Sequence, residues 1–180
     1  STVPVGTSRQ TVLPILQEKA SRVLLASCPE RTAEGIALQE LRELPQIIGG
    51  LDEESTDRAQ EVFRHVTHTS IEVSSLEAAE LIKLVDNSHR DLSFAFANEV
   101  GLLCEGWDLD PLELIRSANT AYSRTRIPVP GFVGGACLTK DPHILAYSAR
   151  QKGREANLAH YSRKVNESLL PYTFDKLLKM

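Results

Sequence analysis

The longest helical pattern in the chain is residues 76–106, LEAAELIKLVDNSHRDLSFAFANEVGLLCEG. Its apolar residues lie on more than one side, unlike those of a helix with a single buried face. A helix of about thirty residues is roughly 45 Å long, which is longer than a compact domain usually needs. This stretch therefore predicts a helix that crosses between domains and packs against a second copy of the chain.

The residues before this helix have the pattern of a small α/β domain. Residues 8–21 favour a helix, residues 23–26 and 45–50 are apolar runs typical of buried strands, and residues 69–73 favour an edge strand. Strands that alternate with helices indicate a parallel sheet. Functional groups in such sheets lie beyond the carboxyl ends of the strands, which makes residues 27–35 a candidate site.

The residues after the long helix predict four more helices, over 108–119, 141–152, 155–168 and from 171 onward. The fold class that follows is an α/β remnant of a Rossmann-type domain with short parallel strands, followed by a mainly α-helical domain built on the long helix. Two prolines and a glycine-rich loop interrupt the helical pattern before residue 141.

The amino-acid composition excludes several classes of function for this chain. The chain has 180 residues, of which 42% are hydrophobic and 24% charged, as in an ordinary globular protein. The net charge of −4 gives no reason to expect a nucleic acid or an anionic membrane as a partner. No apolar run reaches the roughly 18 residues of a membrane span, and residues 1–7 lack the basic and apolar pattern of a signal peptide. Three widely spaced cysteines fit a reducing, cytoplasmic setting and no metal motif.

Residues 128–141, PVPGFVGGACLTKD, place a cysteine at the end of a glycine-rich loop. Lys140 follows Cys137 three residues later, and a nearby cation lowers the pKa of a thiol and favours the reactive thiolate. The pattern therefore makes Cys137 a candidate nucleophile. The alternative is a tight turn that leads into a helix, with Cys137 as a small buried residue.

Two polar pairs have helical spacing. Glu30 and Glu34 would share the first turn of a helix, either as part of a site or because the helix dipole favours acidic residues there. Lys83 and Asn87 lie one turn apart on the long helix, either facing a site or on a solvated face. Spacing alone leaves both alternatives open.

Five ordered segments together resemble the UDP-glucose/GDP-mannose dehydrogenase family of nucleotide-sugar 6-dehydrogenases. The segments are residues 1–7, 28–35, 77–87, 98–99 and 134–141. The resemblance implies oxidation of the C6 primary alcohol of a UDP-hexose to a carboxylate, with NAD as the cofactor, in sugar-nucleotide and polysaccharide biosynthesis. It implies that residues 1–74 are the end of an NAD-binding Rossmann-like domain, residues 75–168 a central dimerisation domain, and residues 169–180 the start of a UDP-binding domain.

The resemblance also implies roles for individual residues. Cys137 matches the nucleophile, which forms a thiohemiacetal and then a thioester. The other catalytic positions are Thr2, Glu30, Glu34, Lys83, Asn87 and Asp141. The cofactor-binding positions are Ser1, Thr2, Val3, Glu34, Cys137 and Lys140. The substrate-binding positions are Glu30, Glu34, Lys83, Asn87, Arg124, Pro128, Val129, Pro130, Gly131, Phe132, Val133 and Gly134.

Several points stay open at this level. The chain has no G-x-G-x-x-G segment, so we expect it to be a fragment that is inactive by itself. Glu30-Arg31-Thr32 is similar to members that act on N-acetylated sugars, and Lys140-Asp141 to those that act on UDP-glucose. The resemblance implies a homodimer through the long helix, with Arg124 or Arg126 reaching the partner's site. A catalytically silent dimerisation module and an unrelated cysteine enzyme with a histidine base are the competing interpretations.

Overall fold

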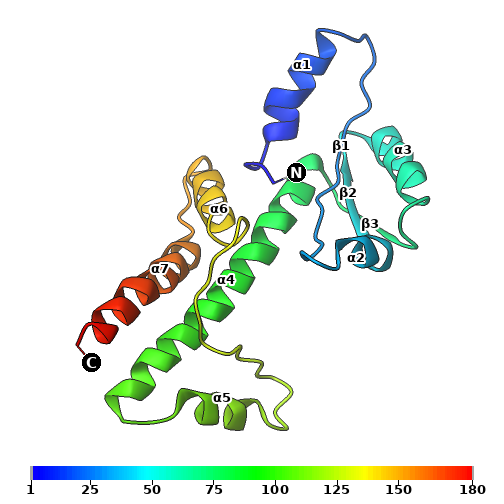
Figure 1. Cartoon of the computed structure of the whole chain (residues 1–180). Coiled ribbons are helices and arrows are strands. Elements are labelled where there is room, and N and C mark those ends of the chain that lie inside the picture. The colour runs from blue at the N-terminus through cyan, green and yellow to red at the C-terminus, as the bar shows by residue number, and fades with distance from the viewer. Residues whose placement is uncertain (1, 180) are drawn as a thin grey trace. The chain divides into compact units, whose positions relative to one another are not determined.

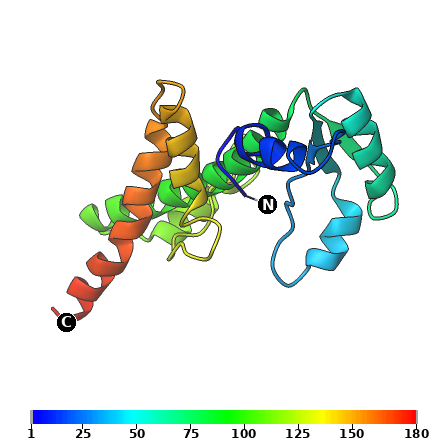
Figure 2. The same ribbon diagram turned by 90° about the horizontal axis from the view of Figure 1, so that it is seen from above.

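The computed structural model describes residues 2–179, which form two compact units. The first unit ends at Val85 and the second begins at Asp86, so the division falls inside helix α4, Leu76–Gly106. The predicted bounds of this long helix are confirmed. Figure 1 labels the helices and strands, and Figure 2 shows the same ribbon from above.

A three-stranded sheet with the order β1-β2-β3 forms the centre of the first unit. Strand β2, Gln46–Gly50, is buried at each of its residues and pairs in parallel with β3, Ser70–Glu72. Helix α3, Glu53–Phe63, connects these two strands and packs against β2. Its first turn is capped by Asp52, whose carboxylate accepts a hydrogen bond from the backbone of Ser55 at 2.8 Å. The parallel βαβ unit of the described residues is therefore β2-α3-β3, and the one predicted around residues 8–26 is wrong, because no strand precedes residue 8 among them.

Strand β1, Ala26–Ser27, departs from the expected parallel sheet because it pairs with β2 in the antiparallel sense. The pairing covers only two residues, Ala26 opposite Gly50 and Ser27 opposite Gly49. Antiparallel neighbouring strands need no long crossover connection. The connection from β1 to β2 contains one short helix, α2, Ala37–Glu43. Both residues of β1 are half-buried, and β1 overlaps the predicted buried strand of residues 23–26 only at Ala26.

The helix predicted over residues 8–21 is two shorter elements. A π-helical segment, Ser8–Val12, leads into α1, Leu13–Gln17. Pro14 lies in the first turn of α1 and has no N–H, so it cannot continue the hydrogen-bond pattern of the residues before it. The change of helix type at this point follows from that missing donor.

The carboxyl end of β2 lies directly against the start of α4. A Cβ atom placed on Gly49 would lie 2.1 Å from the backbone oxygen of Ser75 and 2.9 Å from the Cβ atom of Ala79. Only glycine allows this approach, because backbone cannot move aside as a flexible side chain can. Gly49 thus fixes the start of α4 on the sheet of the first unit.

The second unit consists of the remainder of α4 and three more helices. They are α5, Pro111–Asn119, α6, Asp141–Arg150, and α7, Asn157–Leu177. Helix α6 packs against α7, and polar side chains of α7 contact buried residues of α4. Within residues 2–179, no helix has the combined length and apolarity that a bilayer crossing requires.

Helix α7 is continuous where the sequence predicted a break near residue 169. Pro171 lies inside the helix at an exposed position. It has no N–H to donate within the helix, so water can donate to the carbonyl group that is left without this partner. Beyond it, the side chains of Tyr172 and Lys176 both bond to Glu105 on α4. These contacts hold the last turns in helical conformation.

We expect Gly49→Ala to lower the free energy of unfolding by about 1–3 kcal/mol, because the added methyl group collides with backbone. The measurement is urea unfolding of the 180-residue chain followed by circular dichroism. Gly134→Ala is the control, since nothing lies within 4 Å of its Cβ position. Equal stability of the two variants would contradict this account of the β2–α4 contact.

Candidate functional site

The glycine-rich loop ends in a turn that presents Cys137 to solvent. Gly135 has φ +86°, which few other residues adopt, and the turn continues through Lys140. The carbonyl of Cys137 accepts hydrogen bonds from the backbone of Lys140 at 3.2 Å and of Asp141 at 2.9 Å. The thiol is exposed, so the alternative of a small buried cysteine is wrong.

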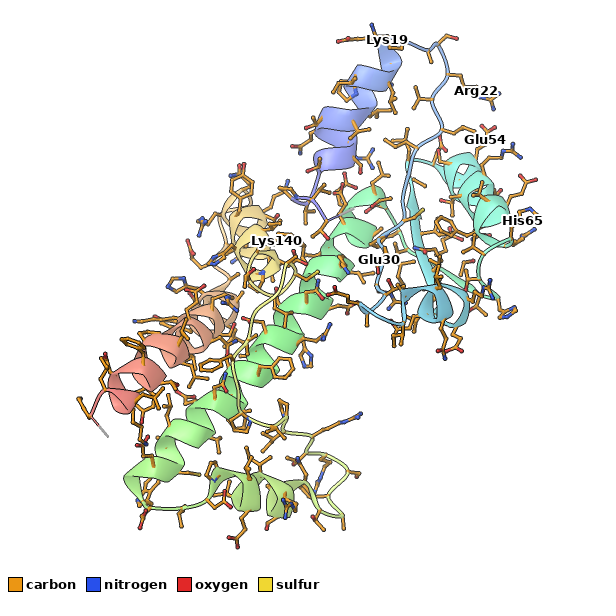
Figure 3. All side chains as sticks on the ribbon, in the orientation of Figure 1. Lys19, Arg22, Glu30, Glu54, His65 and Lys140 are labelled. Atoms are coloured by element: carbon orange, nitrogen blue, oxygen red, sulfur yellow. The ribbon has the colours of Figure 1, made fainter. Side chains whose placement is uncertain are left out.

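Asp141 opens helix α6 and is completely buried. One of its carboxylate oxygens accepts from the Asn87 side chain at 2.5 Å, and the other accepts from the Lys140 ammonium at 2.5 Å. A carboxylate in the first turn is also stabilised by the helix dipole. The structure thus brings together Asn87, Lys140 and Asp141. Lys140 and Asp141 closely follow Cys137 along the chain, and Figure 3 labels Lys140.

Lys83 and Asn87 are both buried on α4, with 7% and 5% of their surfaces exposed. The alternative of a solvated face is therefore wrong. Asn87 uses its amide nitrogen to bond Asp141, which leaves its side-chain oxygen available as an acceptor. Lys83 belongs to the first unit, where its charge acts on Glu30.

Glu30 and Glu34 do not share a helix face, which corrects the prediction from their spacing. Residues 28–33 are irregular, Glu34 lies in an exposed turn, and α2 starts only at Ala37. Gly35 has φ +89°, and the Glu30 carboxylate bonds the backbone of Thr32. Such local side-chain bonds compete with helix formation.

The carboxyl group of Glu30 is held in its ionised form. Burial by itself raises the pKa of Glu30, but the hydrogen bonds from Thr32 and the positive charge of Lys83 outweigh it, so the pKa lies below the usual value. A carboxyl group of lowered pKa is a weaker base. Glu30 therefore suits charge pairing or hydrogen bonding better than proton abstraction at neutral pH.

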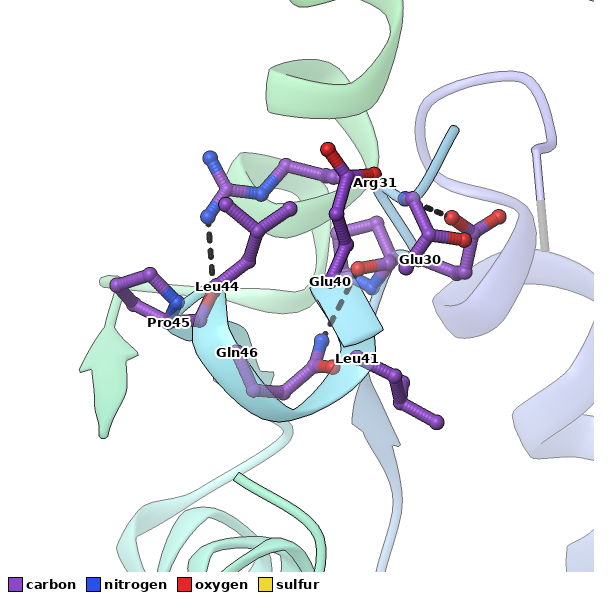
Figure 4. A pocket seen from close by; sticks show the side chains of 9 residues that line it. Glu30, Arg31, Glu40, Leu41, Leu44, Pro45 and Gln46 are labelled. Carbon is purple, nitrogen blue, oxygen red and sulfur yellow. Dashed lines mark hydrogen bonds between the residues drawn. The ribbon is translucent and has the colours of Figure 1, made fainter. Parts of the chain in front are cut away.

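A small hollow of about 10 Å³, room for about one water molecule, lies between the segment of Glu30 and helix α2 (Figure 4). Arg31 donates to the carbonyl of Pro45 at 2.7 Å, and Gln46 donates to the carbonyl of Pro29 at 3.0 Å. These two bonds tie the segment after β1 to the start of β2. They therefore fix the backbone on both sides of Glu30.

Glu80 holds residues at the start of the first unit. It lies within the motif of residues 77–87, and no role was predicted for it. Glu80 is buried on α4, and its carboxylate accepts from the backbone of Gly6 at 2.6 Å and of Ser8 at 2.8 Å. Thr2 and Val3 are half-buried in the segment that this clamp holds, and Ser1 lies outside the described residues. The sequence places Glu80 one helical turn from the apolar residues Leu76 and Leu84, but its burial, which reveals this role, is visible only in the structure.

The rest of the loop before Cys137 is extended along the second unit. The backbone of Gly131 donates to Asn98 at 2.7 Å, and Val129 and Phe132 are exposed. Pro128, Pro130 and Val133 are half-buried, and Gly134 is exposed. Arg124 stacks on Tyr122 at 4.7 Å from the ring centre, and Arg126 is exposed, so neither arginine is held in the site of this chain. Within residues 2–179, no group of three or more histidine, cysteine or acidic side chains could hold a metal ion.

We expect iodoacetamide to label Cys137 at least about tenfold faster than Cys28 or Cys104 in the folded chain. Cys137 is exposed, Cys104 is 3% exposed, and burial raises the pKa of Cys28 to about 11. Because the thiolate reacts, labelling of Cys28 should rise only as the pH approaches 11. Peptide mass spectrometry against pH measures all three rates, with the chain in denaturant as control. Equal rates in the folded chain would contradict the arrangement.

Comparison with known proteins agrees with this arrangement. Residues 1–67 match the NAD binding domain of the UDP-glucose/GDP-mannose dehydrogenase family, and residues 77–168 match its central domain. The chain is 34% identical to a UDP-N-acetyl-D-mannosamine dehydrogenase of Campylobacter jejuni, covering 99% of the chain and 46% of that protein. It is 33% identical to one of Methanocaldococcus jannaschii, covering 100% and 41%.

Solved structures that resemble this chain are also nucleotide-sugar dehydrogenases. A UDP-D-ManNAc dehydrogenase of Pyrococcus horikoshii superposes with a TM-score of 0.90 at 31% identity, over 99% of this chain and 43% of that one. A UDP-glucose dehydrogenase of Pyrobaculum islandicum superposes with a TM-score of 0.86 at 28% identity, over 99% and 42%. The chain spans less than half the length of the relatives it matches. Both parts of the chain match consecutive domains of one family, so the chain belongs to the UDP-glucose/GDP-mannose dehydrogenase family.

Proposed function

We propose that the protein containing this chain oxidises the C6 primary alcohol of a UDP-hexose to a uronic acid, in sugar-nucleotide and polysaccharide biosynthesis. The observation that carries the proposal is the exposed Cys137 thiol on the turn before Asp141, with the buried Asp141 carboxylate bonded to Asn87 and Lys140. An exposed thiol beside an ordered set of polar groups is what covalent capture of an aldehyde needs. Family membership supports the same reaction.

In this proposal Cys137 acts as the nucleophile. Its thiolate sulfur attacks the C6 aldehyde carbon of the half-oxidised sugar, and the carbonyl oxygen takes a proton to give a thiohemiacetal. Loss of a hydride from C6 and of the hydroxyl proton converts this adduct into a thioester. Water then attacks the thioester carbon, the C–S bond breaks, and the sulfur leaves as thiolate while the sugar is released as the carboxylate.

In the proposed reaction, the polar groups that match the family's catalytic positions control charge and protons. Lys83 supplies positive charge, and the second N–H of the Asn87 amide a hydrogen bond, for the oxyanion that develops at C6. Because its nitrogen is bonded to Asp141, Asn87 presents its oxygen to the attacking water. Asp141 assists the proton transfer, and Glu30, Glu34 and Thr2 complete the polar surroundings of the sugar.

The donor set of this chain fits part of an NAD molecule. Carboxylate and hydroxyl groups, as on Glu34 and Thr2, suit ribose hydroxyls, and the Lys140 ammonium, whose side chain is 49% exposed, suits a phosphate. NAD, when bound, accepts the hydrides of both oxidation steps. Val3 and Cys137 complete the contacts assigned to the cofactor. The chain has no G-x-G-x-x-G segment, so these residues supply only part of the binding site.

We infer that the substrate is a UDP-N-acetylhexosamine, with UDP-N-acetyl-D-mannosamine first and UDP-glucose second. Several relatives at 31–34% identity are named UDP-N-acetyl-D-mannosamine dehydrogenases, and a UDP-glucose dehydrogenase structure is at 28%. The loop of residues 128–134 would lie along this substrate. Residues 1–74 would belong to the NAD-binding domain, residues 75–168 to the central domain and residues 169–180 to the start of the next domain.

We further propose a homodimer through α4. Its residues Leu81, Val85, Phe96 and Leu103 are 39%, 48%, 52% and 53% exposed. Together with the half-exposed Leu92, their positions differ successively by four or seven residues, the spacing of one helix face. A symmetric partner using the same face would cover these side chains. Arg124 or Arg126 would then reach the partner's sugar site.

The complete gene product that carries this chain should reduce two NAD for each UDP-N-acetyl-D-mannosamine, measured by NADH absorbance and by mass spectrometry of the acid. Cys137→Ala should lower kcat on the order of a thousandfold or more, because it removes the nucleophile. Cys104→Ala is the matched control and should stay within about twofold. Activity of Cys137→Ala equal to that of the unmodified protein would exclude the covalent route. A lack of oxidation of any UDP-sugar would favour a silent dimerisation module.

The 180-residue chain should be a dimer at micromolar concentration, and Phe96→Glu should weaken the dimer at least about 30-fold, because it places a charge in the contact. Light scattering over a dilution series measures this. Phe174→Glu is the matched control, since Phe174 is 60% exposed but lies on α7. A monomeric unmodified chain, or equal loss of dimer in both variants, would count against the α4 interface.

A further inference from the structure

We propose that Asn98 is a positioning residue for the substrate loop, residues 128–134, and that a buried ion pair determines which end of its amide faces that loop. The inference rests on the proposed function, in which this loop lies along the UDP-sugar. It concerns residues of the second unit only, and none of them belongs to the catalytic set around Cys137.

Asn98 anchors the middle of the loop. Its side chain is 1% exposed, and its oxygen accepts from the backbone of Gly131 at 2.7 Å. On either side of Gly131 the side chains of Val129 and Phe132 are 66% and 65% exposed, so they give the loop little packing of its own. A loop with few buried side chains depends strongly on such a backbone anchor.

The orientation of the Asn98 amide is not determined by shape, because the oxygen and nitrogen of an amide are nearly equal in size. It is determined by the next group. The Asn98 nitrogen donates to the Asn166 oxygen at 2.9 Å, and the Asn166 nitrogen donates to Asp91, to a carboxylate oxygen at 2.9 Å and to the backbone oxygen at 3.0 Å. A carboxylate and a carbonyl only accept, so Asn166 must turn its nitrogen toward Asp91.

The far end of this series is a buried ion pair. Asp91 is 0% exposed and Arg163 is 2% exposed, and they are joined at 2.7 Å. Ser162 donates to the second carboxylate oxygen at 3.0 Å. The guanidinium of Arg163 and the hydroxyl of Ser162 both donate to the Asp91 carboxylate, which therefore offers only acceptor oxygens to Asn166.

The side chains of Arg163, Asp91, Asn166 and Asn98 therefore form a series of hydrogen bonds, here called the relay. In this relay each of the two amides has only one favourable orientation. Arg163 holds Asp91, which orients Asn166, and Asn166 orients Asn98 so that its oxygen faces Gly131. If either amide were reversed, two acceptors or two donors would face each other in a buried region, which is costly. A change at Asn166, which does not touch the loop, should therefore loosen the loop.

The first test is hydrogen exchange of single backbone amides in the 180-residue chain, followed by NMR. In Asn98→Ala the Gly131 amide should exchange about five- to tenfold faster, as expected for one lost hydrogen bond. Asn166→Ala should produce an increase of similar size with Asn98 intact. Should Asn98→Ala fail to fold, Asn98→Ser takes its place, since its side chain is too short to span both contacts.

Asn119→Ala is the matched control. Asn119 also holds loop backbone, with bonds of 2.8 and 2.9 Å to Ile127, but it has no part in the relay. It should speed exchange at Ile127 and leave Gly131 unchanged. An unchanged Gly131 rate in the Asn98 variant would overturn the anchor, and an unchanged rate in Asn166→Ala would overturn the relay.

The second test separates positioning from chemistry in the complete gene product. Asn98→Ala and Asn166→Ala should raise the KM for the UDP-sugar about tenfold while kcat stays within about threefold, because the loop contributes to binding before and during the reaction alike. A fall in kcat with unchanged KM would contradict a positioning role. If the unmodified protein oxidises no UDP-sugar, the proposed function fails, while the exchange rates still decide the anchor and the relay.

Discussion

Most polar side chains buried along α4 have hydrogen-bond partners, with Ser88 as an exception, and these bonds place most of the segments around the helix. An unpaired buried polar group would cost several kcal/mol in an apolar medium. Glu80 pairs with the backbone at Gly6, Asn87 with Asp141, Asp91 with Arg163 and Asn98 with Gly131. Each partner comes from a segment distant in sequence, so the helix organises both units through polar contacts.

The same helix has an unusual distribution of apolar surface. The small side chains of Ala79, Ala95 and Ala97 are buried, whereas the larger side chains of Phe96 and Leu103 remain half-exposed. A helix of a monomeric protein normally has the opposite pattern. The polar inner face serves the site and the loop, and the apolar outer face is what a second subunit would cover under the dimer proposal.

The chemistry of the candidate site follows from a short turn between an extended loop and a helix. The glycine-rich loop has little packing of its own, whereas α6 starts at once with the fully buried Asp141. Cys137 lies on the turn that joins them, and its backbone carbonyl accepts the first hydrogen bonds of the helix. The thiol is therefore exposed on a backbone that the helix holds in place, as a nucleophile requires.

The sequence by itself determined the long helix, the strands near residues 45–50 and 69–73, and the family, because periodicity and ordered motifs are properties of neighbouring residues. It also singled out Cys137, Lys83, Asn87 and Asp141. It placed Glu30 and Glu34 on one helix face wrongly, since a local bond to Thr32 and the positive φ of Gly35 end any helix there.

Only the tertiary structure decided the direction of β1, the continuity of α7 and the roles of Glu80 and Asn98. Each depends on contacts between residues about 25 to 75 positions apart, such as Ser8 with Glu80 or Asn98 with Asn166. Local spacing shows that a polar residue lies on a helix, but burial and the geometry of the partner decide whether it is solvated or holds a loop. Whether such a residue is solvated or holds a loop depends on how far its polar group is removed from water and on which hydrogen-bond partner it meets. Both depend on the whole fold.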